Sequence, residues 1–88
     1  MSPLHDASCA GDTELVKKLL DEGAPLDEKD EDGNTSLMWA SMEGHTEVVR
    51  LLLDKGALLD EKNEYGWTAL MDASRNGHTE VVLSLIHI

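Results

Sequence analysis

The sequence repeats itself at a spacing of 33 residues. Residues 2–34, SPLHDASCAGDTELVKKLLDEGAPLDEKDEDGN, align with residues 35–67, TSLMWASMEGHTEVVRLLLDKGALLDEKNEYGW, and 18 of the 33 positions are identical. A third copy begins at Thr68, where TALMDASRNGHTEVV matches the second copy at 11 of 15 positions. Repeats of this length are typical of solenoids, in which each copy is one supersecondary unit that buries its apolar face against its neighbours.

Each copy contains two stretches with helical spacing, followed by a polar loop. The first stretch begins after a residue with a hydroxyl, which can accept a hydrogen bond from a backbone N–H at the start of the helix. In the first copy the next residue is Pro3, which has no N–H and is well suited to the first helical position. In the second copy Gly44 interrupts the first stretch, Thr46 begins the second, and Gly56 is expected to end it in a left-handed conformation. The predicted N-caps are Ser2, Thr35 and Thr68. The positions expected on small or apolar inner faces are Leu37, Ala40, Ser41, Val48, Val49, Leu52 and Leu53.

The spaced motifs of the copies resemble the ankyrin repeat family. The family's opening T-P-L-H-x-A appears here as SPLHDA, TSLMWA and TALMDA, and GHTEVV and LLLDKGA also agree with it. The resemblance covers residues 2–82 and implies an all-α solenoid, an L-shaped stack of helix-turn-helix pairs with turn or hairpin fingers projecting from one edge. It implies a single domain over residues 1–88, with repeats at 2–34 and 35–67 and a partial repeat at 68–82.

Histidines occupy two of the positions at which the ankyrin repeat family has structural histidines. His5 takes the family's structural place in the first helix, whereas Met38 and Met71 replace it in the later copies, so its usual hydrogen bond is expected to be absent there. His45 and His78 stand at the start of the second helices, where the family uses the ring to tie loops together. Because these two histidines recur at the repeat period, we expect a scaffold role for them and not catalysis.

The last six residues, LSLIHI, depart from the repeat. Residues 83–88 match residues 50–55 only at Leu85. Two interpretations are open: LSLIHI resembles the translated end of a transposon used in sequencing libraries, which would make it adapter read-through after Val82, or it is a divergent half-repeat that caps the stack. The tail residues expected on a solvent-facing stripe are Leu83, His87 and Ile88.

Charge restricts the class of partner. Eighteen acidic side chains against seven basic ones give a formal net charge of −11, which repels phosphate backbones and anionic lipid surfaces. We therefore expect no nucleic acid and no membrane as partner and favour a basic protein surface, although such acidity also simply keeps a small domain soluble. Cys9 is the single cysteine, and no stretch has the length of a membrane span or the pattern of a signal peptide. An intracellular, cytoplasmic location is expected.

Two patterns resemble metal sites, and each lacks a ligand that such a site requires. The acidic loop DEKDEDG, residues 27–33, would put Trp39 where a calcium loop needs its bidentate glutamate. His5 and Cys9 are four residues apart but have no third metal ligand beside them. Phosphate-binding loops, nucleophile elbows and dinucleotide motifs do not occur in the sequence. We expect no catalytic residue, no cofactor and no metal site.

The positions that differ between copies indicate where a partner binds. In ankyrin-like folds the finger tips and the first-helix face line a concave groove, and all three aromatic residues, Trp39, Tyr65 and Trp67, fall at such positions. Large aromatic side chains dominate binding hot spots, although the two tryptophans would also shield the helix and loop beside them. The acidic rim is expected to comprise Glu31, Asp32, Glu43, Glu64 and Asp72. The predicted partner-binding residues are Trp39, Met42, Glu43, Tyr65, Trp67, Asp72, Arg75, Asn76, Glu31 and Asp32.

These observations favour a non-catalytic protein-interaction module. Its concave groove would hold a protein or peptide with a basic segment, through cation–π contact at the centre and electrostatic steering at the edge. The rival interpretation is the N-terminal regulatory arm of a larger enzyme, channel or kinase, whose activity would follow Val82. More repeats after that residue would favour the module, and a catalytic signature would favour the rival.

Overall fold

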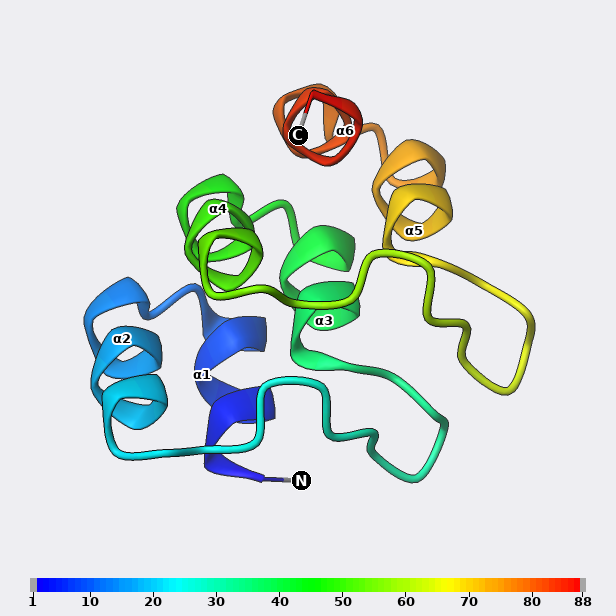
Figure 1. The fold of residues 1–88 in the computed structure, drawn as a ribbon. Coiled ribbons are helices and arrows are strands. Elements are labelled where there is room, and N and C mark those ends of the chain that lie inside the picture. The colour runs from blue at the N-terminus through cyan, green and yellow to red at the C-terminus, as the bar shows by residue number, and fades with distance from the viewer. Residues whose placement is uncertain (1, 88) are drawn as a thin grey trace.

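The computed structural model describes residues 2–87, which form helices joined by turns and loops, with no strand in that range (Figure 1). The helices are α1 (Pro3–Ala10), α2 (Thr13–Asp21), α3 (Ser36–Met42), α4 (Thr46–Asp54), α5 (Ala69–Arg75) and α6 (Thr79–Ile86). Each repeat contributes one antiparallel pair, so the expected all-α solenoid of helix-turn-helix units is confirmed. Within the described residues, no helix has the length and apolar character needed to cross a membrane.

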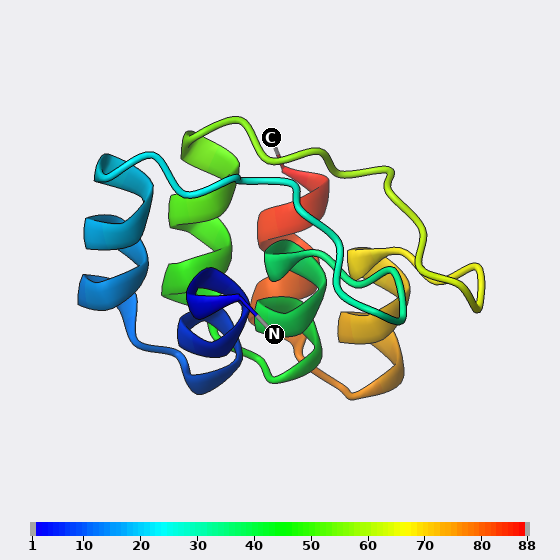
Figure 2. The same cartoon turned by 90° about the horizontal axis from the view of Figure 1, so that it is seen from below.

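The six helices form two layers. Helices α1, α3 and α5 pack side by side in one layer, and α2, α4 and α6 pack in the other (Figure 1). The two long loops, from α2 to α3 and from α4 to α5, run across the same end of the helix pairs and project to one side (Figure 2). The stack therefore brings both loops next to the layer of α1, α3 and α5.

The first helix of each repeat starts at the predicted hydroxyl. The Oγ of Ser2 accepts a hydrogen bond from the backbone N–H of His5 at 3.3 Å. The Oγ1 of Thr35 accepts one from Met38 at 3.2 Å, and Thr68 repeats the arrangement in α5. The Sδ of Met38 in turn accepts from the Thr35 N–H at 3.4 Å. Each hydroxyl thus satisfies an amide that the helix leaves unpaired, which fixes where the helix begins.

Two histidines tie neighbouring repeats together, as the resemblance implies. The Nε2 of His45 lies 2.8 Å from the carbonyl oxygen of Cys9, and the Nε2 of His78 lies 3.0 Å from that of Met42. Each ring therefore donates to the repeat before its own. The ring of His45 leaves no room for a side chain at Gly11, where a Cβ would lie 2.5 Å from the ring Nδ1 and φ is 76°.

The core is aliphatic and lies between the two layers. Six of the seven positions expected on inner faces are buried, whereas Leu53 is only partly buried at the edge of the core. None of the three aromatic residues belongs to this core. The buried apolar side chains are Leu4, Ala7, Val16, Leu37, Met38, Ala40, Val48, Val49, Leu52, Ala57, Ala69, Ala73, Val81 and Leu85.

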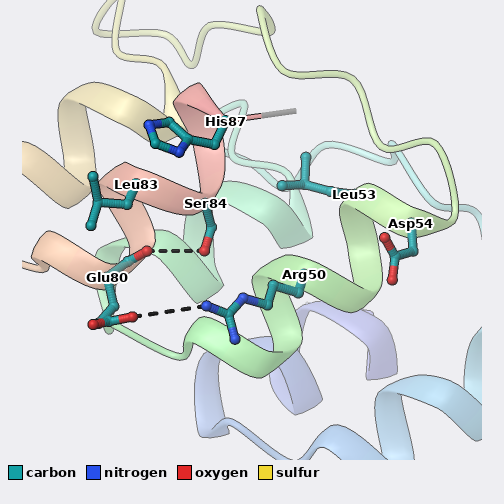
Figure 3. A pocket seen from close by; sticks show the side chains of 7 residues that line it. All are labelled: Arg50, Leu53, Asp54, Glu80, Leu83, Ser84 and His87. Atoms are coloured by element: carbon teal, nitrogen blue, oxygen red, sulfur yellow. Dashed lines mark hydrogen bonds and ion pairs between the residues drawn. The ribbon is translucent and has the colours of Figure 1, made fainter.

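Helix α6 runs through the divergent tail as far as Ile86. Leu85 is 4% exposed at the repeat position of the buried Leu52, whereas Leu83 and Ile86 are 44% and 54% exposed. His87 is exposed as expected, and Ile88 lies outside the described residues. Figure 3 shows the hollow of about 350 Å³ between α4 and α6, where Arg50 lies 3.8 Å from Glu80.

Candidate functional site

The first finger, residues 27–34, is closed by one aspartate. The backbone N–H of Asp30 donates to the carbonyl oxygen of Asn34 at 2.9 Å, and the Asp30 Oδ1 accepts from the N–H groups of Asp32 and Asn34, each at 2.9 Å. Gly33 completes the turn with φ of 79°. An aspartate side chain that bonds to the backbone two residues later stabilises such a turn.

The second finger, residues 60–67, uses an asparagine in the same way. The Oδ1 of Asn63 accepts from the backbone N–H groups of Tyr65 at 2.9 Å and Trp67 at 3.0 Å. Its Nδ2 donates to the Oδ1 of Asn34 in the first finger at 2.9 Å. The amide side chain therefore closes its own finger and joins it to the neighbouring one.

Further contacts fix the fingers relative to each other. The backbone N–H of Glu64 donates to the carbonyl oxygen of Asp32 at 2.9 Å, and Lys29 lies 3.3 Å from Glu61. Because the fingers are bonded side by side before any partner arrives, a segment bound against them need not order them first.

Two hollows lie along the fingers and the layer of first helices. The aromatic groove has a volume of about 560 Å³ and lies between the fingers and α3 and α5. It is lined by Asn34, Trp39, Met42, Asn63, Tyr65, Trp67, Asp72, Arg75 and Asn76. The acidic hollow, also about 560 Å³, lies between the first finger and the start of α1. It is lined by Ser2, His5, Glu28, Lys29, Asp30, Glu31, Asp32 and Trp39. Trp39 belongs to both.

The structure divides the ten predicted binding residues among three places. Seven line the aromatic groove, Glu31 and Asp32 line the acidic hollow, and Glu43 lines neither, because it caps the exposed end of α3. Sequence reasoning missed Asn34, Asn63 and Asp30, although Asp30 and Asn63 occupy the same repeat position and both carry an oxygen that can close a turn.

Trp39 stands on α3 with its ring edge bonded to the first finger. It is half-buried, and its Nε1 donates to the Oδ2 of Asp30 at 2.8 Å. Burial raises the pKa of Asp30, but hydrogen bonds from Asn34, Trp39 and Asp32 outweigh this and leave the pKa below its ordinary value. Asp30 therefore holds the ring in place, and Trp39 lines both hollows.

Trp67 and Tyr65 form the outer wall of the aromatic groove. Tyr65 is 70% exposed, whereas Trp67 is half-buried. The guanidinium carbon of Arg75 lies 4.6 Å from the centroid of the Trp67 ring, which is a cation–π contact. The groove therefore already accommodates a guanidinium group against its aromatic wall.

Asp72 does not belong to the rim. It is only 6% exposed on α5, and its Oδ2 is buried and has no hydrogen-bond partner among residues 2–87. Burial raises the pKa of its carboxyl above the ordinary value, and the positive charge of Arg75 offsets only part of that effect. The groove therefore contains a carboxylate oxygen that no donor in the described chain satisfies.

His5 and Cys9 both lie on α1, but His5 is buried and Cys9 is only partly buried. The Nε2 of His5 lies 2.8 Å from the carbonyl oxygen of Glu28, so the ring holds the loop after α2 against α1. Burial raises the pKa of the Cys9 thiol, and the carboxylates of Glu43 and Asp6 add to the effect. No group of three or more possible metal ligands occurs within the part of the chain that the structure describes.

Comparison with known proteins places the chain in a family. The family model described as "Ankyrin repeats (3 copies)" matches residues 4–88. The crystal structure of the human ASB11 ankyrin repeat domain superposes with a TM-score of 0.95 at 29% sequence identity, over 99% of this chain but 39% of that one. None of the curated proteins searched matches the sequence. The chain therefore belongs to the ankyrin-repeat family, and ankyrin repeats are generally non-catalytic modules for protein–protein interaction.

Proposed function

We propose that this chain holds a protein or peptide with a basic segment in the aromatic groove. The observation that carries the proposal is the placement of the aromatic residues. Trp39, Tyr65 and Trp67 come from a helix and a finger, yet all three line one groove whose walls are bonded in place. Rigid aromatic side chains at the centre of a concave surface are the usual anchors of a binding interface.

The aliphatic core supports this interpretation, because packing does not require any of the three rings. Core positions are filled by leucine, valine, alanine and methionine. An aromatic ring that is left at the surface costs little when solvated but contributes a large apolar area when a partner covers it. Tyr65, the most exposed of the three at 70%, has the most surface to lose on binding.

The charge of the chain supports a basic segment over an acidic one. The formal net charge is −11, and Glu31 and Asp32 of the first finger stand beside the aromatic groove in the acidic hollow. Such a field raises the association rate of a positively charged segment and opposes that of a negative one.

A selection experiment tests the proposal directly. Random-sequence peptides displayed on phage are selected on the immobilised chain, and the enriched peptides are synthesised and titrated. Substituting Trp67→Ala or Tyr65→Ala should weaken their binding about tenfold or more, since each removes an aromatic wall. The control is Leu58→Ala, which truncates an exposed side chain away from the groove. Affinities that respond equally to all three substitutions would contradict the assignment of the groove.

A further inference from the structure

Asp72 is the one carboxylate of the aromatic groove, and nothing in residues 2–87 donates to its Oδ2. The residue is 6% exposed, and the Oδ2 atom itself is buried. A buried charge without a partner is costly, and native proteins normally satisfy such groups. An unsatisfied acceptor in a binding groove indicates a donor that comes from outside the chain.

The fold itself does not require a buried carboxylate at this position. Asp6 occupies the same repeat position in α1 and is exposed, whereas Trp39 occupies it in α3. The burial of Asp72 is therefore a property of the groove, in which Trp67 and Arg75 lie nearby, and not of the repeat.

The nearest cation of the chain does not neutralise Asp72. Arg75 is three residues further along α5, but its guanidinium lies over the ring of Trp67 and makes no ion pair with Asp72 in the described structure. The charge of Arg75 only partly offsets the effect of burial on the carboxyl. Arg75 also marks a place in the groove where a guanidinium fits against an aromatic face, 4.6 Å from its centroid.

We infer that Asp72 is the receptor for one arginine side chain of the bound segment, which hydrogen-bonds to this carboxylate and takes the place of Arg75 over Trp67. This inference rests on the proposed function of the groove. The missing donor, the negative charge of the chain and the flat aromatic wall each match a guanidinium, which is planar, always charged and able to donate and stack at once. Lysine lacks the planar face.

Binding of the arginine requires Arg75 to leave the ring of Trp67. Substitutions of Asp72 and of Arg75 should therefore change the affinity in opposite directions. D72N removes the charge but keeps the shape, so it should weaken an arginine-bearing peptide about tenfold to a hundredfold. R75Q removes both the competing group and a like charge, so it should tighten the same peptide. D6N, which changes an exposed acid at the same repeat position outside the fingers and both hollows, is the matched control and should leave affinity unchanged within a factor of about two.

The experiment uses peptides selected on the wild-type chain and resynthesised with citrulline, the neutral isostere of arginine, or with lysine. One arginine should recur among the enriched peptides, and its replacement by citrulline should cost about as much as D72N. In the D72N variant, replacing the arginine by citrulline should cause little further loss of affinity, because both changes remove the same interaction between arginine and Asp72. Lysine at that position should bind several-fold more weakly than arginine.

The possible failures are distinguishable. Peptides that depend on Trp67 and Tyr65 but carry no common arginine, or that bind D72N as tightly as wild type, would overturn the role of Asp72 and leave the groove intact. A lysine peptide that binds as well as the arginine one would overturn the choice of arginine, and a loss of affinity in R75Q would overturn the displacement of Arg75. If no enriched peptide depends on Trp67 or Tyr65, both the receptor and the proposed function fail.

Discussion

At the scale of single residues, the turns of the two fingers are closed by chemically different side chains at the same repeat position, Asp30 and Asn63. Asp30 uses one oxygen for its own finger and the other for the Nε1 of Trp39, so it needs two acceptors. Asn63 uses its oxygen for its own finger and its Nδ2 as a donor to Asn34. Each side chain has the donor and acceptor pattern that its neighbour requires, and an exchange of the two would fit neither place.

Replacing Asp30 with asparagine should therefore be destabilising despite the small change in shape. Asparagine has only one side-chain oxygen, so it can accept either from the indole N–H of Trp39 or from the backbone N–H groups of the finger, but not from both. Asp30→Asn should therefore lower the free energy of unfolding by about 1–2 kcal/mol. Urea titration followed by tryptophan fluorescence measures this. Asp60→Asn, at an exposed position, is the control, and equal midpoints for the two variants would contradict the account.

The two aspartates with shifted pKa values should respond to pH in opposite directions. The pKa of Asp30 is lowered in the folded state, so its contribution to stability is present above the unfolded pKa and is lost as pH falls through the folded one. The pKa of Asp72 is raised by burial, so its ionised form destabilises the fold above the unfolded pKa, and that penalty disappears as pH falls.

For the free protein, D72N should consequently raise the melting temperature by a few degrees at pH 7 and leave it nearly unchanged at about pH 3, where the carboxyl is already neutral. Thermal unfolding followed by circular dichroism at both pH values provides the measurement. A variant that is less stable than wild type at pH 7 would mean that the carboxylate has a partner within the fold.

At the scale of helices and loops, the sequence predicts most of what the structure contains, because the determinants are local. The caps at Ser2, Thr35 and Thr68 and the left-handed Gly56 that follows α4 are predicted by residue types at fixed offsets from an apolar pattern. The burial of Asp72 was not predictable, since the same residue type at the same repeat position is exposed as Asp6. The contact of Arg75 with Trp67 depends on how a finger lies against α5, which no local pattern specifies.

The turn between the helices of a repeat gives a prediction at this scale. Gly44 has φ of 76°, and a Cβ there would lie 2.6 Å from the Nδ1 of His78, whereas Gly56 has φ of 94° with nothing within 4 Å. Both Gly→Ala changes incur the cost of a left-handed backbone, about 1 kcal/mol, but only Gly44→Ala also displaces the ring. We expect Gly44→Ala to lower the free energy of unfolding by about 1–2 kcal/mol more than Gly56→Ala in urea titrations. Equal losses would show that the ring adjusts without cost.

At the scale of the whole molecule, charge opposes the compactness of the stack. The formal net charge is −11, and the ion pairs formed between repeats among residues 2–87 are exposed, such as Lys55 with Asp21 at 3.8 Å and Arg50 with Glu80 at 3.8 Å. Exposed pairs contribute little, so the repulsion among the excess carboxylates should dominate the response to salt.

Added salt should therefore stabilise this protein. We expect the melting temperature to rise between low ionic strength and about 0.5 M NaCl, where exposed charges more than a few ångströms apart are screened. Sodium chloride is a suitable probe because its ions act mainly by screening, and a parallel titration with sucrose controls for general exclusion effects. If the melting temperature fell with salt instead, the attraction within the ion pairs between repeats would contribute more to stability than the repulsion among the excess carboxylates.

The position of Trp39 bears on the register in which an extended segment would bind. Its indole is a wall of both the aromatic groove and the acidic hollow, and Asp30 holds it in place. Under the proposed function, an extended segment that reached into both hollows would contact this ring from each of them. If a segment binds in the groove as proposed, the fixed indole would set its register, and a sequence shifted by one residue would present a different side chain to Asp72.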